Sequence, residues 1–212
     1  MDIESVIEIL DQEFKKNKMP IVDLIQIQTN DPFKILVTTI LSARTKDAVT
    51  AEVADNLFQS IDSYKDLADF TLEEIEKMIY KIGFFHNKAK YLKKLPDALE
   101  DEFDGIVPNE IDELVKLPGV GRKTANLVRA IAFKKPAVCV DVHVHRICNR
   151  LDYVNTKTPF ETEMKLREIL PKKHWIKFNS ILVSHGQNVC KPRNPQCFKC
   201  KIKDYCKSNS SK

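Results

Sequence analysis

The sequence predicts an all-α fold. Apolar residues recur at three- and four-residue steps along most of the chain, and no segment shows the strict alternation that is typical of half-buried strands. Only five glycines occur among the 212 residues, so each of them marks a place where the backbone needs unusual freedom. We therefore expect helices joined by short turns.

Start signals and apolar periodicity place the individual helices. Ile3, Val6, Ile7, Leu10 and Phe14 form the apolar stripe of a first amphipathic helix. The later start signals are an N-cap and first-turn proline at Asp31-Pro32, an N-cap at Asp47, and a capping box at Thr71 and Glu74. Further helical patterns cover residues 87–102, 122–133, 142–151, 159–170 and 173–189.

Basic side chains are concentrated at the C-terminus. Residues 190–212 carry seven Lys and Arg against one Asp, whereas the whole chain has a net charge of +4. A local basic patch suits a protein that binds a phosphate backbone, but it also suits a tail that is kept polar for solubility. Charge alone leaves both interpretations open.

Four of the six cysteines lie close together in the pattern C-x6-C-x2-C-x5-C, at Cys190, Cys197, Cys200 and Cys206. Because the N-terminus lacks the pattern of a secretory signal and no apolar run is long enough to cross a membrane, we expect a soluble intracellular protein with reduced thiols. Four thiolates can hold zinc or an iron–sulfur cluster, and the spacing leans only mildly away from zinc. Cys139 and Cys148 lie in apolar surroundings and are expected in the core.

The segment 114–125 joins two predicted helices through a glycine turn. Its apolar residues can bury one side, while Gly119 and Gly121 allow a sharp turn and a close approach to another surface. The first turn of the helix that follows offers N–H groups that suit a phosphate. The glycine spacing fits neither a dinucleotide-binding fingerprint nor a Walker A loop, and an ordinary helix–turn–helix corner is the alternative.

Lys123 and Asp141 are polar residues at the starts of two predicted helices. At Lys123, the helix N-terminus and partial burial would both disfavour the protonated amine, which favours a nucleophile; a phosphate contact is the simpler role. Asp141 lies 18 residues later, after the apolar run 137–140, where it can act as an N-cap.

Three elements together resemble the endonuclease III family of helix-hairpin-helix DNA glycosylases. They are the hairpin at 117–125, the segment 140–144 and the cysteine spacing, which occur in the family's order and at its separations. The resemblance covers nearly the whole chain. It implies a base-excision repair enzyme that removes oxidised pyrimidines from duplex DNA and then cleaves the abasic site by β-elimination.

The resemblance also implies the roles of individual residues. Lys123 attacks C1′ of the sugar, expels the base and forms a Schiff base, while Asp141 stabilises positive charge on the sugar and can help to activate Lys123 or a water. Related enzymes that remove a base without cutting the strand carry another residue in place of this lysine, so the pair indicates a bifunctional enzyme. The four cysteines bind a structural [4Fe–4S] cluster, and the rigid loop 191–196 presents Lys191 and Arg193 to the DNA backbone.

Two turns are implied to fill the gap that the rotated-out nucleotide leaves in the duplex. The turn at 41–47 contains Arg44, where the family often has glutamine, and the turn at 82–88 contains Phe84, where leucine is frequent. A simple core position is the alternative for Phe84. Val142, where threonine is common, is a lesser departure. The other expected DNA contacts are His86, Gly119, Gly121, Arg122 and His143.

We expect two helical lobes with the active cleft between them, and Lys123 and Asp141 facing each other across it. The central lobe spans 25–135, and residues 1–24 join 136–212 in a discontinuous lobe that carries the cluster loop 190–206. We expect a monomer that acts on DNA in the cytoplasm, in association with the nucleoid. A non-catalytic DNA-binding module and a redox protein are the alternatives, and neither of them needs the lysine–aspartate pair.

Overall fold

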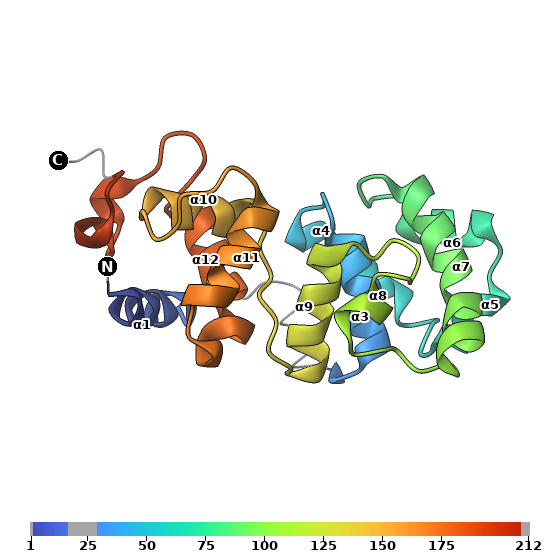
Figure 1. Cartoon of the computed structure of the whole chain (residues 1–212). Helices are drawn as coiled ribbons and strands as arrows, with labels where there is room; N and C mark the ends of the chain where they lie inside the picture. The colour runs from blue at the N-terminus through green and yellow to red at the C-terminus, as the bar shows by residue number, and fades with distance from the viewer. Residues whose placement is uncertain (1, 17–28, 209–212) are drawn as a thin grey trace. The chain divides into compact units, whose positions relative to one another are not determined.

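A computed structural model describes residues 2–16 and 29–208, which form helices and turns and contain no strand (Figure 1). The prediction of an all-α fold is confirmed. The chain packs as two compact units, Ile21–Lys135 and Met1–Pro20 with Pro136–Lys212, and each unit has a hydrophobic core of its own. The predicted boundary between residues 24 and 25 lies outside the described residues. None of the helices among the described residues is long and apolar enough to cross a membrane.

The unit Ile21–Lys135 is built around one buried helix. Its helices are α3 (Pro32–Ser42), α4 (Asp47–Leu57), α5 (Tyr64–Asp69), α6 (Leu72–Ile79), α7 (Phe85–Phe103), α8 (Ile111–Leu114) and α9 (Arg122–Phe133). Nearly every residue of α3 is buried, because α3 packs against α4, α7 and α9. The long helix α7 also packs against α5 and α6. These contacts fix the turns that connect α3 with α4 and α6 with α7.

Two of the three predicted start signals in this unit are confirmed. Asp31 is the N-cap of α3 and accepts a hydrogen bond from the backbone N–H of Phe33 at 2.8 Å. Thr71 and Glu74 form the predicted capping box. The prediction that Asp47 caps a helix is wrong, because α4 begins at Asp47 itself and its N-cap residue makes no side-chain bond to the helix.

The second unit contains α1 (Ile3–Phe14), α10 (Val142–Arg150), α11 (Pro159–Ile169) and α12 (Trp175–Asn188), with 3-10 turns η1 (Lys172–His174), η2 (Cys197–Lys199) and η3 (Lys203–Tyr205). In this unit α12 packs against α1 on one side and against α10 on another, and α10 packs against α11. Cys139 and Cys148 are both buried, as predicted, and burial raises the pKa of the Cys148 thiol. The core of this unit therefore positions α10 and the cysteine segment that follows α12.

Candidate functional site

The predicted hairpin is a tight turn between α8 and α9. The apolar residues of its inner side are buried, as predicted: Leu114, Leu117 and Val120. Gly119 has a φ of +77°, and a Cβ at this position would lie 2.6 Å from Cδ2 of Tyr91, so both the turn and the packing require glycine. Gly121 is the N-cap of α9, and a Cβ there would meet no other part of the described chain within 4 Å. The backbone at Gly121 is therefore open to a ligand.

Lys123 lies in the first turn of α9, directly after this open position. Its side chain is exposed, and so is that of Arg122, because Ala125 is the first residue of α9 that reaches the core. The expected partial burial of the Lys123 amine stays a prediction. The residue stands at the N-terminal end of a helix, where the helix dipole favours a bound anion such as a phosphate.

Asp141 is the N-cap of α10, as predicted. Its Oδ1 atom accepts hydrogen bonds from the backbone N–H groups of His143 at 2.8 Å and Val144 at 2.9 Å. The residue is 9% exposed, so its carboxylate is held in one orientation at a mostly buried helix start. Such a fixed negative charge can stabilise a cation that forms beside it. Lys123 and Asp141 belong to different units, and their facing each other stays a prediction.

His143, an expected DNA contact, is half-buried and packs closely against α12. A Cβ at Gly186 would lie 2.4 Å from Nδ1 of His143, and Nη2 of Arg146 lies 3.0 Å from the same nitrogen. Gly186 therefore allows α10 and α12 to approach each other at this point. Sequence analysis missed this role, although a glycine inside the helical pattern 173–189 is the usual signal of close helix packing.

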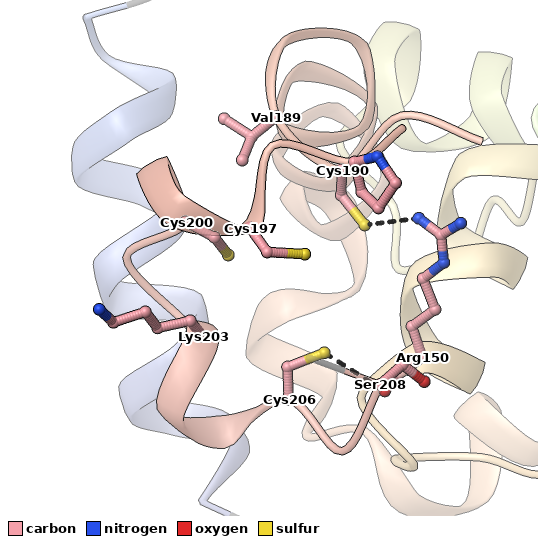
Figure 2. Close-up of a pocket in the computed structure, with 9 residues that line it drawn as sticks. Arg150, Val189, Cys190, Cys197, Cys200, Lys203, Cys206 and Ser208 are labelled. Carbon is pink, nitrogen blue, oxygen red and sulfur yellow. Dashed lines mark hydrogen bonds between the residues drawn. The ribbon is translucent and has the colours of Figure 1, made fainter. Parts of the chain in front are cut away.

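The four cysteines of the C-terminal segment line one cavity of about 200 Å³ (Figure 2). Burial raises the pKa of Cys200 to about 11 and also raises the pKa of Cys206. No three His, Cys, Asp or Glu side chains among residues 2–16 and 29–208 are grouped to hold a metal ion. In a four-iron cluster each thiolate binds a different iron, so four thiols around one cavity are a donor set that fits a cluster.

Two arginines of α10 support the cysteine segment. Nη1 of Arg150 donates to Sγ of Cys190 at 3.3 Å (Figure 2). The same nitrogen donates to the Lys191 carbonyl at 2.8 Å. Nη2 of Arg146 donates to the Cys190 carbonyl at 2.7 Å. Lys191 and Arg193 are exposed, as expected for residues that contact DNA. Sequence analysis missed both supporting arginines, although their spacing of four residues puts them on one face of α10.

The two turns that were expected to read the lesion lie together in the unit Ile21–Lys135. Arg44 and Phe84 both adopt left-handed backbone conformations, with φ of +55° and +59°. The guanidinium carbon of Arg44 lies 5.3 Å from the centre of the Phe84 ring, which is a cation–π contact. Phe84 is 60% exposed, so a simple core position for it is wrong. His86 is exposed and its Nδ1 atom lies 2.8 Å from Oε1 of Glu76.

Comparisons with known proteins identify the family of this chain. Residues 37–172 match the model of the HhH-GPD superfamily of base excision DNA repair proteins. Endonuclease III of Thermotoga maritima is 43% identical over 176 residues, which cover 83% of each chain. Endonuclease III of Bacillus subtilis is 38% identical over 184 residues, which cover 86% of this chain and 84% of the relative.

Solved structures give the same result. A trapped endonuclease III–DNA covalent intermediate matches with a TM-score of 0.88 at 35% identity, over 99% of this chain and 96% of that chain. A thermostable thymine-DNA glycosylase matches with a TM-score of 0.86 at 26% identity, over 99% of this chain and 97% of that chain. The chain therefore belongs to the endonuclease III family, within the HhH-GPD superfamily of base excision DNA repair proteins.

Proposed function

We propose that this protein is a bifunctional DNA glycosylase and abasic-site lyase that removes oxidised pyrimidines from duplex DNA. Membership of the endonuclease III family supports the activity on DNA. The observation that carries the lyase activity is the exposed amine of Lys123, in the first turn of α9 directly after the open backbone of Gly121. One structural relative was captured as a covalent intermediate with DNA, which is the species that an amine nucleophile forms.

In the proposed reaction Nζ of Lys123, in its neutral form, attacks C1′ of the damaged nucleotide. The glycosidic bond breaks, and its electron pair leaves with the base, which takes up a proton. The C1′–O4′ bond then breaks and a proton passes from the nitrogen to O4′, which gives a protonated Schiff base. Removal of a C2′ proton then expels the 3′ phosphate by β-elimination, and water hydrolyses the Schiff base. The Asp141 carboxylate stabilises the positive charge that develops on the sugar.

We propose that phosphate contacts come from the hairpin and the cysteine loop. The backbone from Gly119 to Gly121 and the guanidinium of Arg122 lie at the N-terminus of α9, which favours an anion. Lys191 and Arg193 are exposed on the loop that α10 supports. We expect DNA binding to weaken steeply as salt rises, because each neutralised phosphate releases a counterion. His86 and His143 are proposed as further DNA contacts.

We also propose that Cys190, Cys197, Cys200 and Cys206 bind a [4Fe–4S] cluster. The four thiols around one cavity support this assignment, and the family relationship adds to it. When bound, the cluster would join both ends of the loop 191–196 to η2 and η3 without taking part in base removal. We further propose that the protein is a monomer. Because its substrate is DNA, we expect it to act in the cytoplasm in association with the nucleoid.

Borohydride trapping tests the nucleophile. The full-length protein is incubated with a duplex that carries one oxidised pyrimidine, and borohydride reduces any Schiff base to a stable protein–DNA adduct. We expect an adduct with the unaltered protein and none with Lys123→Gln, together with a loss of strand cutting of at least about 100-fold. Lys116→Gln is the matched control, because Lys116 is exposed on the same hairpin and should still give the adduct.

The panel of duplexes should include several single lesions and an abasic site. An adduct with Lys123→Gln would assign the nucleophile to another amine. If the unaltered protein gave no adduct with any duplex but bound DNA with strong salt dependence, a non-catalytic DNA-binding module would replace the enzyme. Electron transfer through the cluster that does not depend on DNA would instead support a redox protein.

A further inference from the structure

The two turns that carry Arg44 and Phe84 are held in unusual backbone conformations. Neither residue is a glycine, yet both have positive φ. Such conformations are sparsely populated in a free chain and persist only where the surrounding structure fixes them. The stacked pair is also exposed, so burial of the two side chains does not fix it. Some other contact must hold the turns.

Lys88, in the first turn of α7, supplies that contact. Its ammonium donates to the carbonyls of Leu41 at 2.8 Å and Ala43 at 2.5 Å and to Oγ1 of Thr45 at 3.3 Å. These three acceptors lie around Arg44, from the last turn of α3 to the residue after Arg44. Three N–H donors thus meet three oxygens, which is the full donor capacity of a lysine. The turn at Arg44 is therefore fastened to α7.

The second turn lies directly beside the first. The backbone N–H of Lys88 donates to the carbonyl of Phe84 at 3.2 Å, which is the ordinary bond of the first turn of α7 and places Lys88 next to this turn. Gly83, next to Phe84, donates its N–H to Oγ1 of Thr45 at 3.1 Å, and a Cβ at Gly83 would lie 2.6 Å from the Arg44 carbonyl. The two turns are thus in direct contact, and Lys88 bonds to both of them.

A lysine is a costly choice for this place. Lys88 is 5% exposed, and burial lowers its pKa to about 8. A buried ammonium pays a desolvation penalty, which the hydrogen bonds to its three oxygen acceptors must offset. The carbonyl of Leu41 belongs to the C-terminal turn of α3. The last carbonyls of a helix have no N–H partner within the helix, and the helix dipole favours a cation there.

We propose that Lys88 is a positioning residue, which fixes Arg44 and Phe84 as one rigid unit that enters the gap in the duplex. This inference rests on the proposed function. Arg44 and Phe84 would touch DNA, whereas Lys88 acts through them. A preassembled pair loses little conformational entropy on insertion, so more of the binding energy remains to hold the nucleotide outside the stack.

The test compares Lys88→Met with Lys93→Met in the full-length, cluster-containing protein. Lys93 is the matched control because it lies on the same helix and donates to two carbonyls at another turn, those of Ala68 at 2.9 Å and Phe70 at 2.7 Å. Three quantities are measured: the affinity for undamaged duplex, the single-turnover rate of base removal at saturating enzyme, and the fluorescence of a 2-aminopurine beside the lesion, which rises when that base unstacks.

We expect Lys88→Met to keep its affinity for undamaged duplex within about twofold, because phosphate contacts are unaltered. Its single-turnover rate should fall at least about tenfold, since displacement of positioning groups by about 1 Å has effects of that size. The rise in 2-aminopurine fluorescence should shrink in parallel. Lys93→Met should match the unaltered protein in all three measurements.

A purely structural role would lower the melting temperature of Lys88→Met but leave the rate and the fluorescence of the folded protein unchanged, and that result would overturn the inference. If Lys88→Met does not fold, Thr45→Val carries the test, because it removes the hydroxyl that both Lys88 and Gly83 contact. Unaltered rate and fluorescence in Thr45→Val would then refute the inference. Failure of the proposed function is distinct, since the unaltered protein would give no borohydride adduct.

Discussion

At the start of α10, one carboxylate oxygen of Asp141 accepts two backbone N–H bonds, and the same carboxylate is proposed to stabilise the sugar cation. These two roles depend on different properties of the side chain. An N-cap needs an oxygen acceptor, which an amide also provides, whereas stabilisation of a cation needs negative charge. Substitutions at Asp141 can therefore separate the structural role from the chemical one.

Asp141→Asn should keep the helix cap and lose the charge. We expect its free energy of unfolding to stay within about 0.5 kcal/mol of the original value, because asparagine and aspartate cap helices about equally well. Asp141→Ala should cost about 1 kcal/mol more. Both variants should lose at least about 100-fold in single-turnover base removal, because both lack the carboxylate. Thermal unfolding and base release from a lesion duplex give the two readouts.

Asp31→Asn is the control for the first comparison, because Asp31 caps α3 with a bond of 2.8 Å to the N–H of Phe33. It should preserve both stability and base removal. Retention of full activity by Asp141→Asn would assign the charge on the sugar to another group and leave Asp141 as a cap alone.

The role of a single residue can be predicted from the sequence where that role depends on a local motif. The cap at Asp141 follows from its place before an apolar helical pattern. The role of Lys88 could not be predicted in this way, because it depends on which elements pack nearby. In particular, Lys88 lies 47 residues from Leu41, and no local pattern joins them.

Among the elements, the hairpin between α8 and α9 uses its two glycines for different reasons. Gly119 needs glycine for its φ of +77° and for the contact with the Tyr91 ring. Gly121 has an ordinary φ of −89°, and space around it is open. The fold therefore depends on glycine at position 119. At position 121 glycine is needed only if a ligand such as a DNA phosphate approaches the backbone.

Alanine at these two positions should affect different properties. Gly119→Ala should lower the free energy of unfolding by at least about 1 kcal/mol, since it adds strain at positive φ and a clash. Gly121→Ala should change it by no more than about 0.5 kcal/mol, because a poorer N-cap is offset by a stiffer unfolded chain. Its affinity for duplex DNA should nevertheless fall several-fold, because a methyl group would hold the phosphate away.

Melting temperature and salt-dependent DNA affinity are measured on both variants, and Gly119→Ala is the control for the stability of Gly121→Ala. Equal DNA affinity for Gly121→Ala and the unaltered protein would place the phosphate contact elsewhere than at this turn.

Helix starts were predictable where a side chain caps the helix, as at Asp31 and at Thr71 with Glu74. The start at Asp47 was misplaced by one residue, because the true N-cap makes no side-chain bond. The short helix α5 was missed, although Ser63 and Asp66 form a capping box, because six residues carry too little periodicity to stand out.

For the molecule as a whole, the cysteine segment differs from the apolar cores of the two units in how it is stabilised. The unit Ile21–Lys135 has a continuous apolar core around α3. The cysteine segment has little apolar support: within residues 190–208, all of which the structure describes, Ile202 alone is buried. Hydrogen bonds hold both ends of this segment: Arg146 and Arg150 donate to carbonyls at its start, and the N–H of Ser208 donates to the Arg150 carbonyl at 3.1 Å. The proposed cluster would stabilise the part between these ends.

Removal of iron should therefore loosen one part of the molecule and spare the other. The purified protein should be brown, with about four iron and four sulfide per chain. After chelation of the iron under anaerobic conditions, hydrogen exchange in residues 190–208 should accelerate at least about 100-fold, because local opening no longer breaks metal–thiolate bonds. Exchange in α3 and α9 should stay unchanged, since those helices belong to the other core.

Affinity for duplex DNA should fall as the loop with Lys191 and Arg193 loses its shape. Colourless protein with stoichiometric zinc, or unchanged exchange in residues 190–208 after iron loss, would contradict this account.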